Sequence, residues 1–151
     1  MAAERLFVDT WGWLVLANDR DPSFASVTRI RAAASRQPGA WVTTDYVLDE
    51  TITRLFSTAP FATARRFLEG VFDASGQGLL DIEHVTPERF SRAWHMRLRY
   101  RDKQRISFTD LTSFAVMREL GLKHVLTSDA HFEQAGLGFA ILPKAPGARP
   151  N

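Results

Sequence analysis

Short apolar runs alternate with longer amphipathic segments along this chain. Residues 6–8, 41–43, 79–82, 124–127 and 139–142 have the length and composition of buried strands. The segments between them carry apolar residues at spacings of three and four, which is typical of helices that bury one face. Strands that alternate with helices predict an α/β domain with a central, mostly parallel, five-stranded sheet and helices on both faces. We expect the last strand to lie at a sheet edge.

Capping residues indicate where several helices begin. The pair Asp21-Pro22 predicts an N-cap and first helical residue, for a helix that ends near Arg36. Asp45 is expected to cap the helix after the second strand. Thr86-Pro87 opens another helix, and Ser107-Phe108-Thr109-Asp110 has the Ser-x-x-Asp form of a capping box.

Composition limits the class of protein. The chain has 151 residues, of which 45% are hydrophobic and 24% charged, as in a single soluble domain. We expect this domain to span residues 1–142 and the Pro/Gly-rich residues 143–151 to form a disordered tail. No apolar run approaches the ~18 residues of a membrane helix, and we expect no signal peptide. The absence of cysteine excludes disulfides and thiolate metal sites and fits a cytoplasmic protein.

Acidic residues follow the predicted strands. Asp9 comes directly after the first strand, Asp129 follows the fourth, and Asp110 opens a helix. Because ligands bind at the carboxyl edge of a parallel sheet, we expect these side chains to lie together there. Each of these acidic residues alone is explained as a helix cap. Several carboxylates crowded together repel one another, however, and a hard divalent cation removes that repulsion. The helix after the second strand adds either Asp49 or Glu50, and periodicity does not choose between them.

Four motifs resemble those of PIN-domain ribonucleases, most closely the VapC-type toxins of toxin–antitoxin pairs. They are Phe7-Val8-Asp9-Thr10, Tyr46-Val47-Leu48-Asp49-Glu50-Thr51, Ser107-Phe108-Thr109-Asp110 and Leu126-Thr127-Ser128-Asp129-Ala130-His131-Phe132. Four motifs in this order are more specific than any one of them, and the resemblance extends from residue 5 to about residue 142. It selects Glu50 over Asp49. The implied acidic quartet is Asp9, Glu50, Asp110 and Asp129, with Asp9 and Asp110 as the primary metal ligands.

The resemblance also implies an activity and partners. It predicts a Mg²⁺- or Mn²⁺-dependent endoribonuclease that stops translation by cutting tRNA or rRNA, and a cognate antitoxin that inhibits it. It further implies a homodimer, and no membrane partner is expected. The chain has no Gly-x-Ser-x-Gly elbow and no cysteine nucleophile, so we expect metal-assisted hydrolysis of a phosphodiester.

Two other functions are compatible with parts of the pattern. A phosphatase with an aspartyl nucleophile would place a second Asp two residues after Asp9, where Trp11 stands. A non-catalytic PIN-like module that binds RNA or protein is the second alternative. A pure binder of a polyanion gains nothing from four clustered anions, which argues against this alternative.

A basic run precedes Asp110. Residues 89–105 carry seven Lys or Arg side chains against one acid, a local charge of +6, although the whole chain is only +2. The run is either a solvated helix face or a phosphate-binding surface. The candidate RNA contacts are Arg97, Arg99, Arg101, Lys103 and Arg105.

Several polar residues near the motifs have less specific signals. Thr10, Thr127 and Ser128 are expected either to hydrogen-bond the metal ligands or a scissile phosphate, or to cap the backbone locally. His95, His124 and His131 lack the paired spacing of a zinc site, and we expect structural roles for all three.

Overall fold

The computed structural model describes residues 4–34 and 36–144. Its five strands form one sheet in the order β3-β2-β1-β4-β5, and every neighbouring pair is parallel. The predicted five-stranded sheet is confirmed and is parallel throughout, with the last strand at an edge as expected. The strands are β1 (Leu6–Val8), β2 (Trp41–Thr44), β3 (Leu80–Glu83), β4 (His124–Leu126) and β5 (Ala140–Leu142).

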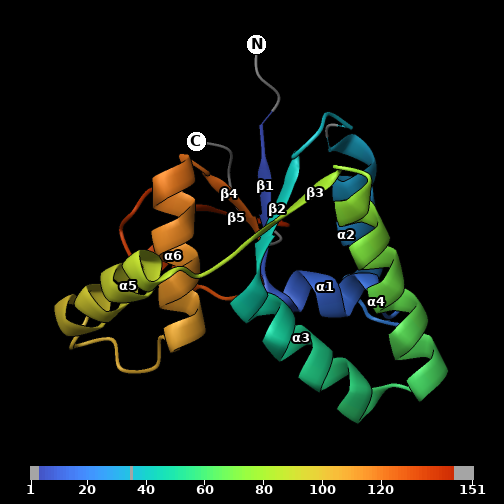
Figure 1. The fold of residues 1–151 in the computed structure, drawn as a ribbon, viewed down its shortest axis with the longest axis horizontal. Helices are drawn as coiled ribbons and strands as arrows, with labels where there is room; N and C mark the ends of the chain where they lie inside the picture. Colours follow the sequence, from blue (N-terminus) through green and yellow to red (C-terminus); the bar gives the residue numbers. More distant parts are fainter. Residues whose placement is uncertain (1–3, 35, 145–151) are drawn as a thin grey trace.

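Seven helices connect and cover these strands within the described residues. Figure 1 shows α5 and α6 on one side of the sheet, and α1, α2, α3 and α4 on the other side and below it. Coverage on both faces explains why every residue of β1 is buried and apolar. The helices are α1 (Thr10–Leu16), α2 (Phe24–Ala33), α3 (Asp45–Thr58), α4 (Phe61–Gly76), α5 (Pro87–Arg99), α6 (Phe108–Leu120) and α7 (His131–Gln134).

The strand order places a switch point beside β1. The chain builds outward from β1 to β2 and β3, then returns to the other side of β1 with β4 and β5. Ligands in open α/β sheets bind outside the carboxyl ends of the strands at such a point. Asp9 directly follows β1, and its backbone N–H donates to the carbonyl of Leu126, the last residue of β4, at 3.2 Å. The ends of the two strands on which the site prediction depends are therefore adjacent.

Two of the predicted caps are confirmed and two are wrong. Thr86 and Ser107 cap α5 and α6 as predicted. Asp45 is not a cap: the hydroxyl of Thr44 accepts the Val47 N–H at 3.1 Å, and Asp45 is the first helical residue. The strand continues one residue further than predicted, which moves the cap to Thr44.

The second helix is shorter than predicted at both ends. Its N-cap is Ser23, and Asp21 instead accepts the backbone N–H of Ser23 at 2.8 Å in the turn before the helix. The helix ends at Ala33, three residues before the predicted Arg36. The local turn that Asp21 forms competes with its use as a cap.

Aromatic packing fixes α6 at one end of the sheet. The ring of Phe114 on α6 lies 4.9 Å from that of Phe132 on α7 and 5.7 Å from that of Phe139 before β5, centroid to centroid. All three rings are buried, and burial of one such side chain contributes about 1.5–3 kcal/mol. This cluster holds the helix that carries Asp110 and the start of α7 at His131 in one rigid unit.

The predictions about the C-terminal tail and about membrane-spanning helices can be compared with the described residues only. Of the predicted tail 143–151, residues 145–151 lie outside the described residues. In the part of the chain that is described, no helix combines the length and the apolar character needed to cross a bilayer.

Candidate active site

Asp9 lies at the switch point between β1 and β4. It occupies the N-cap position of α1, but its side chain makes no capping hydrogen bond. Instead, Asp9 Oδ2 accepts a hydrogen bond of 2.8 Å from the hydroxyl of Thr127, just after β4. Only 7% of Asp9 is exposed, and this burial raises the pKa of its carboxyl to about 6, with further contributions from the charges of Glu50 and Asp129.

Asp110 reaches the same edge from the first turn of α6. The predicted capping box is present: Ser107 Oγ accepts the Asp110 N–H at 3.0 Å, and the Ser107 N–H donates to Asp110 Oδ2 at 3.3 Å. Burial first, and then the charges of Asp9 and Asp129, raise the pKa of the Asp110 carboxyl to about 7. Asp110 is therefore both the N3 residue of a capping box and a member of an anionic cluster.

Asp129 lies in the loop between β4 and α7, where His131 contacts it. Its Oδ1 accepts the backbone N–H of His131 at 2.9 Å, and the ring Nδ1 of His131 lies 3.0 Å from the same oxygen. Asp110, Asp129 and His131 each offer a ligand atom within 4.8 Å of the other two. From the sequence we expected only a structural role for His131, although the spacing Asp129-x-His131 was an available signal.

Glu50 projects from α3 toward α1. Its Oε2 accepts a hydrogen bond of 3.2 Å from the hydroxyl of Thr10, and its Oε1 lies 3.5 Å from Arg54 Nη1. The neighbouring Asp49 is exposed. Glu50 lies outside the tighter group formed by Asp110, Asp129 and His131, yet its charge contributes to the raised pKa of Asp9.

The four carboxylates fit a hard divalent cation. Each has one oxygen held by a local donor, from Thr127, Thr10, Ser107 or His131. Among residues 4–34 and 36–144, no Lys or Arg forms an ion pair with Asp9, Asp110 or Asp129. The buried Asp9 and Asp110 therefore have no cationic side chain beside them, and the half-buried Asp129 has only the imidazole of His131. Oxygen donors with uncompensated negative charge are the ligands that Mg²⁺ and similar ions prefer.

The basic run is not uniformly available to a substrate. The guanidinium of Arg97 donates to the backbone carbonyls of Tyr100, Lys103 and Ile106 at 2.6–2.8 Å, so it holds the loop between α5 and α6. Lys103 lies 3.3 Å from Asp102. The side chains of Arg99, Arg101 and Arg105 are exposed. Both Nη atoms of Arg97 are thus engaged in the loop, and its contact with RNA stays a prediction.

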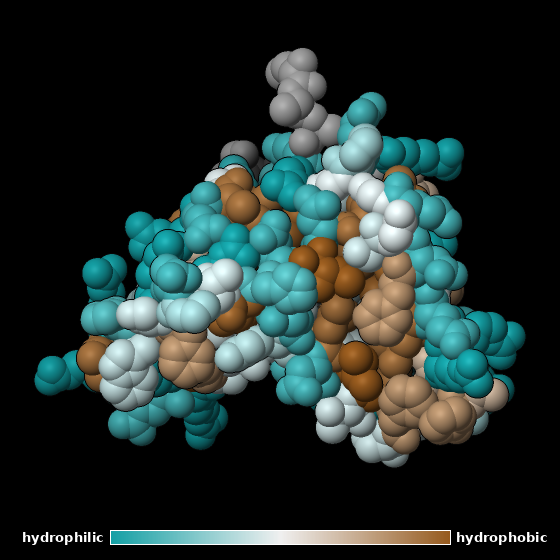
Figure 2. Space-filling model, viewed as in Figure 1, coloured by the Kyte–Doolittle hydropathy of each residue, from teal (hydrophilic) through white to brown (hydrophobic). Residues whose placement is uncertain are grey.

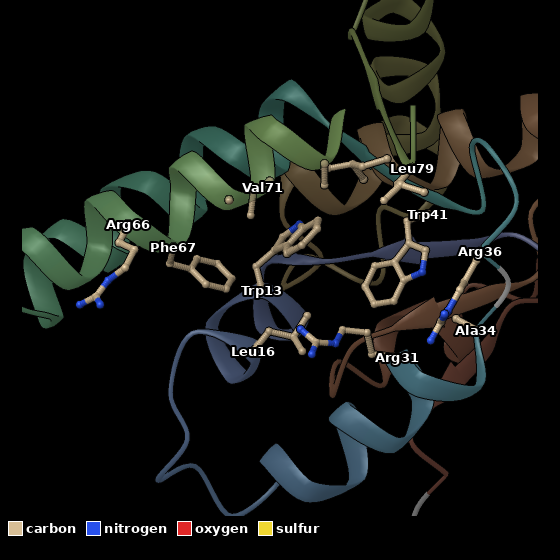
Figure 3. A pocket seen from close by; sticks show the side chains of 13 residues that line it. Trp13, Leu16, Arg31, Ala34, Arg36, Trp41, Arg66, Phe67, Val71 and Leu79 are labelled. Atoms are coloured by element: carbon tan, nitrogen blue, oxygen red, sulfur yellow. The ribbon is translucent and has the colours of Figure 1, made fainter. Parts of the chain in front are cut away.

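An apolar groove of about 540 Å³ lies between α1, α2 and α4, at the amino ends of β2 and β3. Its floor includes Trp13 and Trp41, whose ring centroids are 6.3 Å apart. Figure 3 shows these rings flanked by Arg31 and Arg36 on one side and by Arg66 on the other. Figure 2 shows hydrophobic side chains gathered over the same part of the molecule. No local sequence pattern predicts this groove, because its walls come from α1, α2, α4 and the starts of β2 and β3.

The parallel sheet and its carboxylate cluster define an α/β domain with a candidate metal centre. Comparison with known proteins identifies the family of this domain: the PIN domain family matches residues 6–137. The chain belongs to the PIN-domain family, as the four motifs predicted.

The similar proteins include VapC-type toxins. The chain is 34% identical over 135 residues to the 23S rRNA-specific endonuclease VapC20 of Mycobacterium tuberculosis, covering 87% of this chain and 94% of the relative. The crystal structure of that sarcin–ricin loop cleaving toxin matches with a TM-score of 0.72 at 32% identity, over 87% of this chain and 95% of that one. VapBC-1 from nontypeable Haemophilus influenzae shares the fold, with a TM-score of 0.62 at 14% identity over 90% of this chain and 95% of that one.

Proposed function

We propose that this protein is a metal-dependent endoribonuclease, the toxin of a toxin–antitoxin pair, which inhibits translation by cleaving rRNA or tRNA in the cytoplasm. The observation that carries the proposal is the convergence of Asp9, Glu50, Asp110 and Asp129 at the switch point of the sheet. The similarity to a 23S rRNA-specific endonuclease over 87% of the chain supports rRNA as the first substrate to test.

In this proposal the carboxylates hold Mg²⁺ or Mn²⁺, with Asp9 and Asp110 as the primary ligands and Glu50 and Asp129 completing the site. A bound divalent ion supplies an activated water and stabilises charge on the phosphodiester. The protein contributes orientation, because Thr127, Thr10 and Ser107 each fix one ligand oxygen. Burial of Asp9 and Asp110 also lowers the local dielectric, which strengthens their attraction for a cation.

The direct test is cleavage of defined RNAs by purified, metal-stripped protein. Intact ribosomes, naked rRNA and total tRNA would be incubated with Mg²⁺, with Mn²⁺, or with EDTA, and the cut ends mapped by primer extension. We expect cleavage at one site in one RNA class, only when a divalent ion is present. RNA that is bound but left intact in both metals would support the non-catalytic module instead.

The exposed basic side chains after α5 are proposed to contact RNA phosphates. Removing the charges of Arg101 and Arg105 by substitution with Gln should weaken RNA binding and flatten its salt dependence by roughly 0.7–0.9 of a slope unit for each lost contact. Arg65→Gln, on the exposed face of α4, is the matched control and should leave the slope unchanged. If wild type, the double variant Arg101→Gln/Arg105→Gln and Arg65→Gln all show equal slopes, the basic run is a solvated helix face.

The apolar groove is proposed to hold a segment of the cognate antitoxin that combines apolar and acidic side chains. Its apolar floor favours burial of hydrophobic residues. Within the described part of the chain, Arg31, Arg36 and Arg66 at its rim form no ion pair with an acid, so an acidic segment would complement them.

Gly70 allows the apolar groove to be blocked with one substitution. It lines the groove on α4, and a Cβ at Gly70 meets no atom within 4 Å. Gly70→Phe should therefore fill the groove, weaken antitoxin binding at least tenfold and spare RNA cleavage, as measured by calorimetry and by the cleavage assay. Gly76→Phe, also on α4 and outside the groove, is the control. Unchanged affinity for Gly70→Phe would place the antitoxin elsewhere.

A homodimer is also proposed, with α5 as the contact. Phe90, Trp94 and Leu98 recur every fourth residue on this helix and are 46%, 50% and 53% exposed. An apolar stripe of this kind on a surface helix is typical of an interface.

A further inference from the structure

Asp129 is anchored differently from the other three carboxylates. Asp9 follows a buried strand, Glu50 lies within α3, and Asp110 lies in the first turn of α6, whereas Asp129 belongs to a loop. Its backbone N–H donates to the hydroxyl of Thr127 at 3.1 Å. Its carboxylate lies within 4.8 Å of the Asp110 carboxylate, so repulsion favours turning the side chain toward solvent. A second contact is needed to hold it at the site.

His131 supplies that contact through two of its atoms. Both its backbone N–H and its ring Nδ1 lie within hydrogen-bond distance of Asp129 Oδ1, at 2.9 and 3.0 Å. The next residue, Phe132, is fully buried against Phe114, which fixes the start of α7 and with it the position of the imidazole. Because the backbone N–H and the imidazole both face Oδ1, Oδ2 is the oxygen left free for a metal ion.

We propose that His131 is a positioning residue whose Nδ1–H donates to Asp129 Oδ1, so that Oδ2 of the same carboxylate serves as a metal ligand. The inference rests on the proposed metal-dependent function. It requires a proton on Nδ1. Removing hydrogen-bond partners of this kind typically costs 10- to 100-fold in metal affinity.

A directly ligating imidazole is the competing arrangement, because Asp110, Asp129 and His131 all offer atoms within 4.8 Å of one another. A cation bound to Nδ1 would replace the proton that faces Asp129 Oδ1 at 3.0 Å. Direct ligation and positioning therefore differ in whether Nδ1 carries a metal ion or a proton. The backbone N–H of His131 already donates to the same Oδ1 at 2.9 Å and turns that oxygen toward the start of α7, which favours the positioning role.

Titration of full-length protein with Mn²⁺, followed by calorimetry, tests this role without an activity readout. His131→Asn retains an amide N–H near the position of Nδ1, whereas His131→Leu fills a similar volume without a donor. We expect affinity within about twofold of wild type for His131→Asn and roughly tenfold weaker for His131→Leu. His84→Leu is the matched control, because His84 Nδ1 lies 3.4 Å from Asp45, an acid outside the quartet.

Three results would overturn the inference. The first is wild-type affinity in His131→Leu, and the second is an equal loss in His131→Asn. The third comes from wild-type protein alone: imidazole ¹⁵N shifts with Mg²⁺ bound should show a protonated Nδ1, and a protonated Nε2 with a bare Nδ1 contradicts it. A wild-type protein that binds neither Mg²⁺ nor Mn²⁺ would overturn the proposed function as well, whereas intact binding with an unaffected His131→Leu overturns this inference alone.

Discussion

Asp9→Asn is expected to abolish RNA cleavage while the protein stays folded. Asn has nearly the same shape as Asp, and its carbonyl oxygen can still accept the hydrogen bond from Thr127. It lacks the charge that a hard cation requires. Loss of metal-assisted catalysis removes several kcal/mol of transition-state stabilisation, which corresponds to about 1,000-fold or more in rate. Because the substitution also relieves repulsion among buried anions, the metal-free fold should be as stable as wild type or more so.

Cleavage rates and thermal melting of the two proteins should be compared in Mg²⁺ and in EDTA. Asp49→Asn makes the same chemical change at an exposed position beside Glu50 and should cleave like wild type. Expression without the antitoxin should arrest growth for wild type and for Asp49→Asn, but not for Asp9→Asn. Full cleavage by a folded Asp9→Asn protein would contradict the metal mechanism.

The parts of the site that could be predicted from sequence are those tied to regular structure. Asp9 and Asp110 are placed by a strand end and a capping box, and both signals are local. The contact between Thr10 and Glu50 joins residues 40 positions apart, so no local pattern contains it. The spacing Asp129-x-His131 is a local signal, but the contact of the imidazole with Asp129 depends on the conformation of the loop between them.

The strands, the cap of α3 and the contacts of Arg97 also differ in whether a local sequence pattern predicts them. Runs of apolar residues predicted each strand to within about one residue, since burial on both faces leaves a clear signal. Thr44 and Asp45 are both residues that favour N-cap positions, so the choice between them depended on where the strand ended. A count of charges likewise could not show that Arg97 satisfies three backbone carbonyls.

Metal-free protein is expected to lose stability as the pH rises from about 4 to about 7. The pKa values of Asp9 and Asp110 are raised from 3.8 to about 6 and about 7 in the folded protein. Between about pH 4 and about pH 7 the folded state binds more protons than the unfolded chain, so the free energy of unfolding falls as the pH increases. A pKa difference of one corresponds to about 1.4 kcal/mol, and the summed effect of a few kcal/mol corresponds to roughly 5–10 °C in melting temperature.

Thermal melting in EDTA at pH 5 and pH 8 measures this effect, and Asp9→Asn isolates the contribution of one carboxyl. Wild type should melt at a lower temperature at pH 8 than at pH 5, and Asp9→Asn should show a smaller difference because it cannot ionise at this position. Mg²⁺ binds the ionised carboxylates of the folded protein, so it should raise the melting temperature more at pH 8 than at pH 5. If wild type and Asp9→Asn respond identically to pH and to Mg²⁺, Asp9 is neither a buried anion nor a metal ligand, and the site must be centred on other carboxylates.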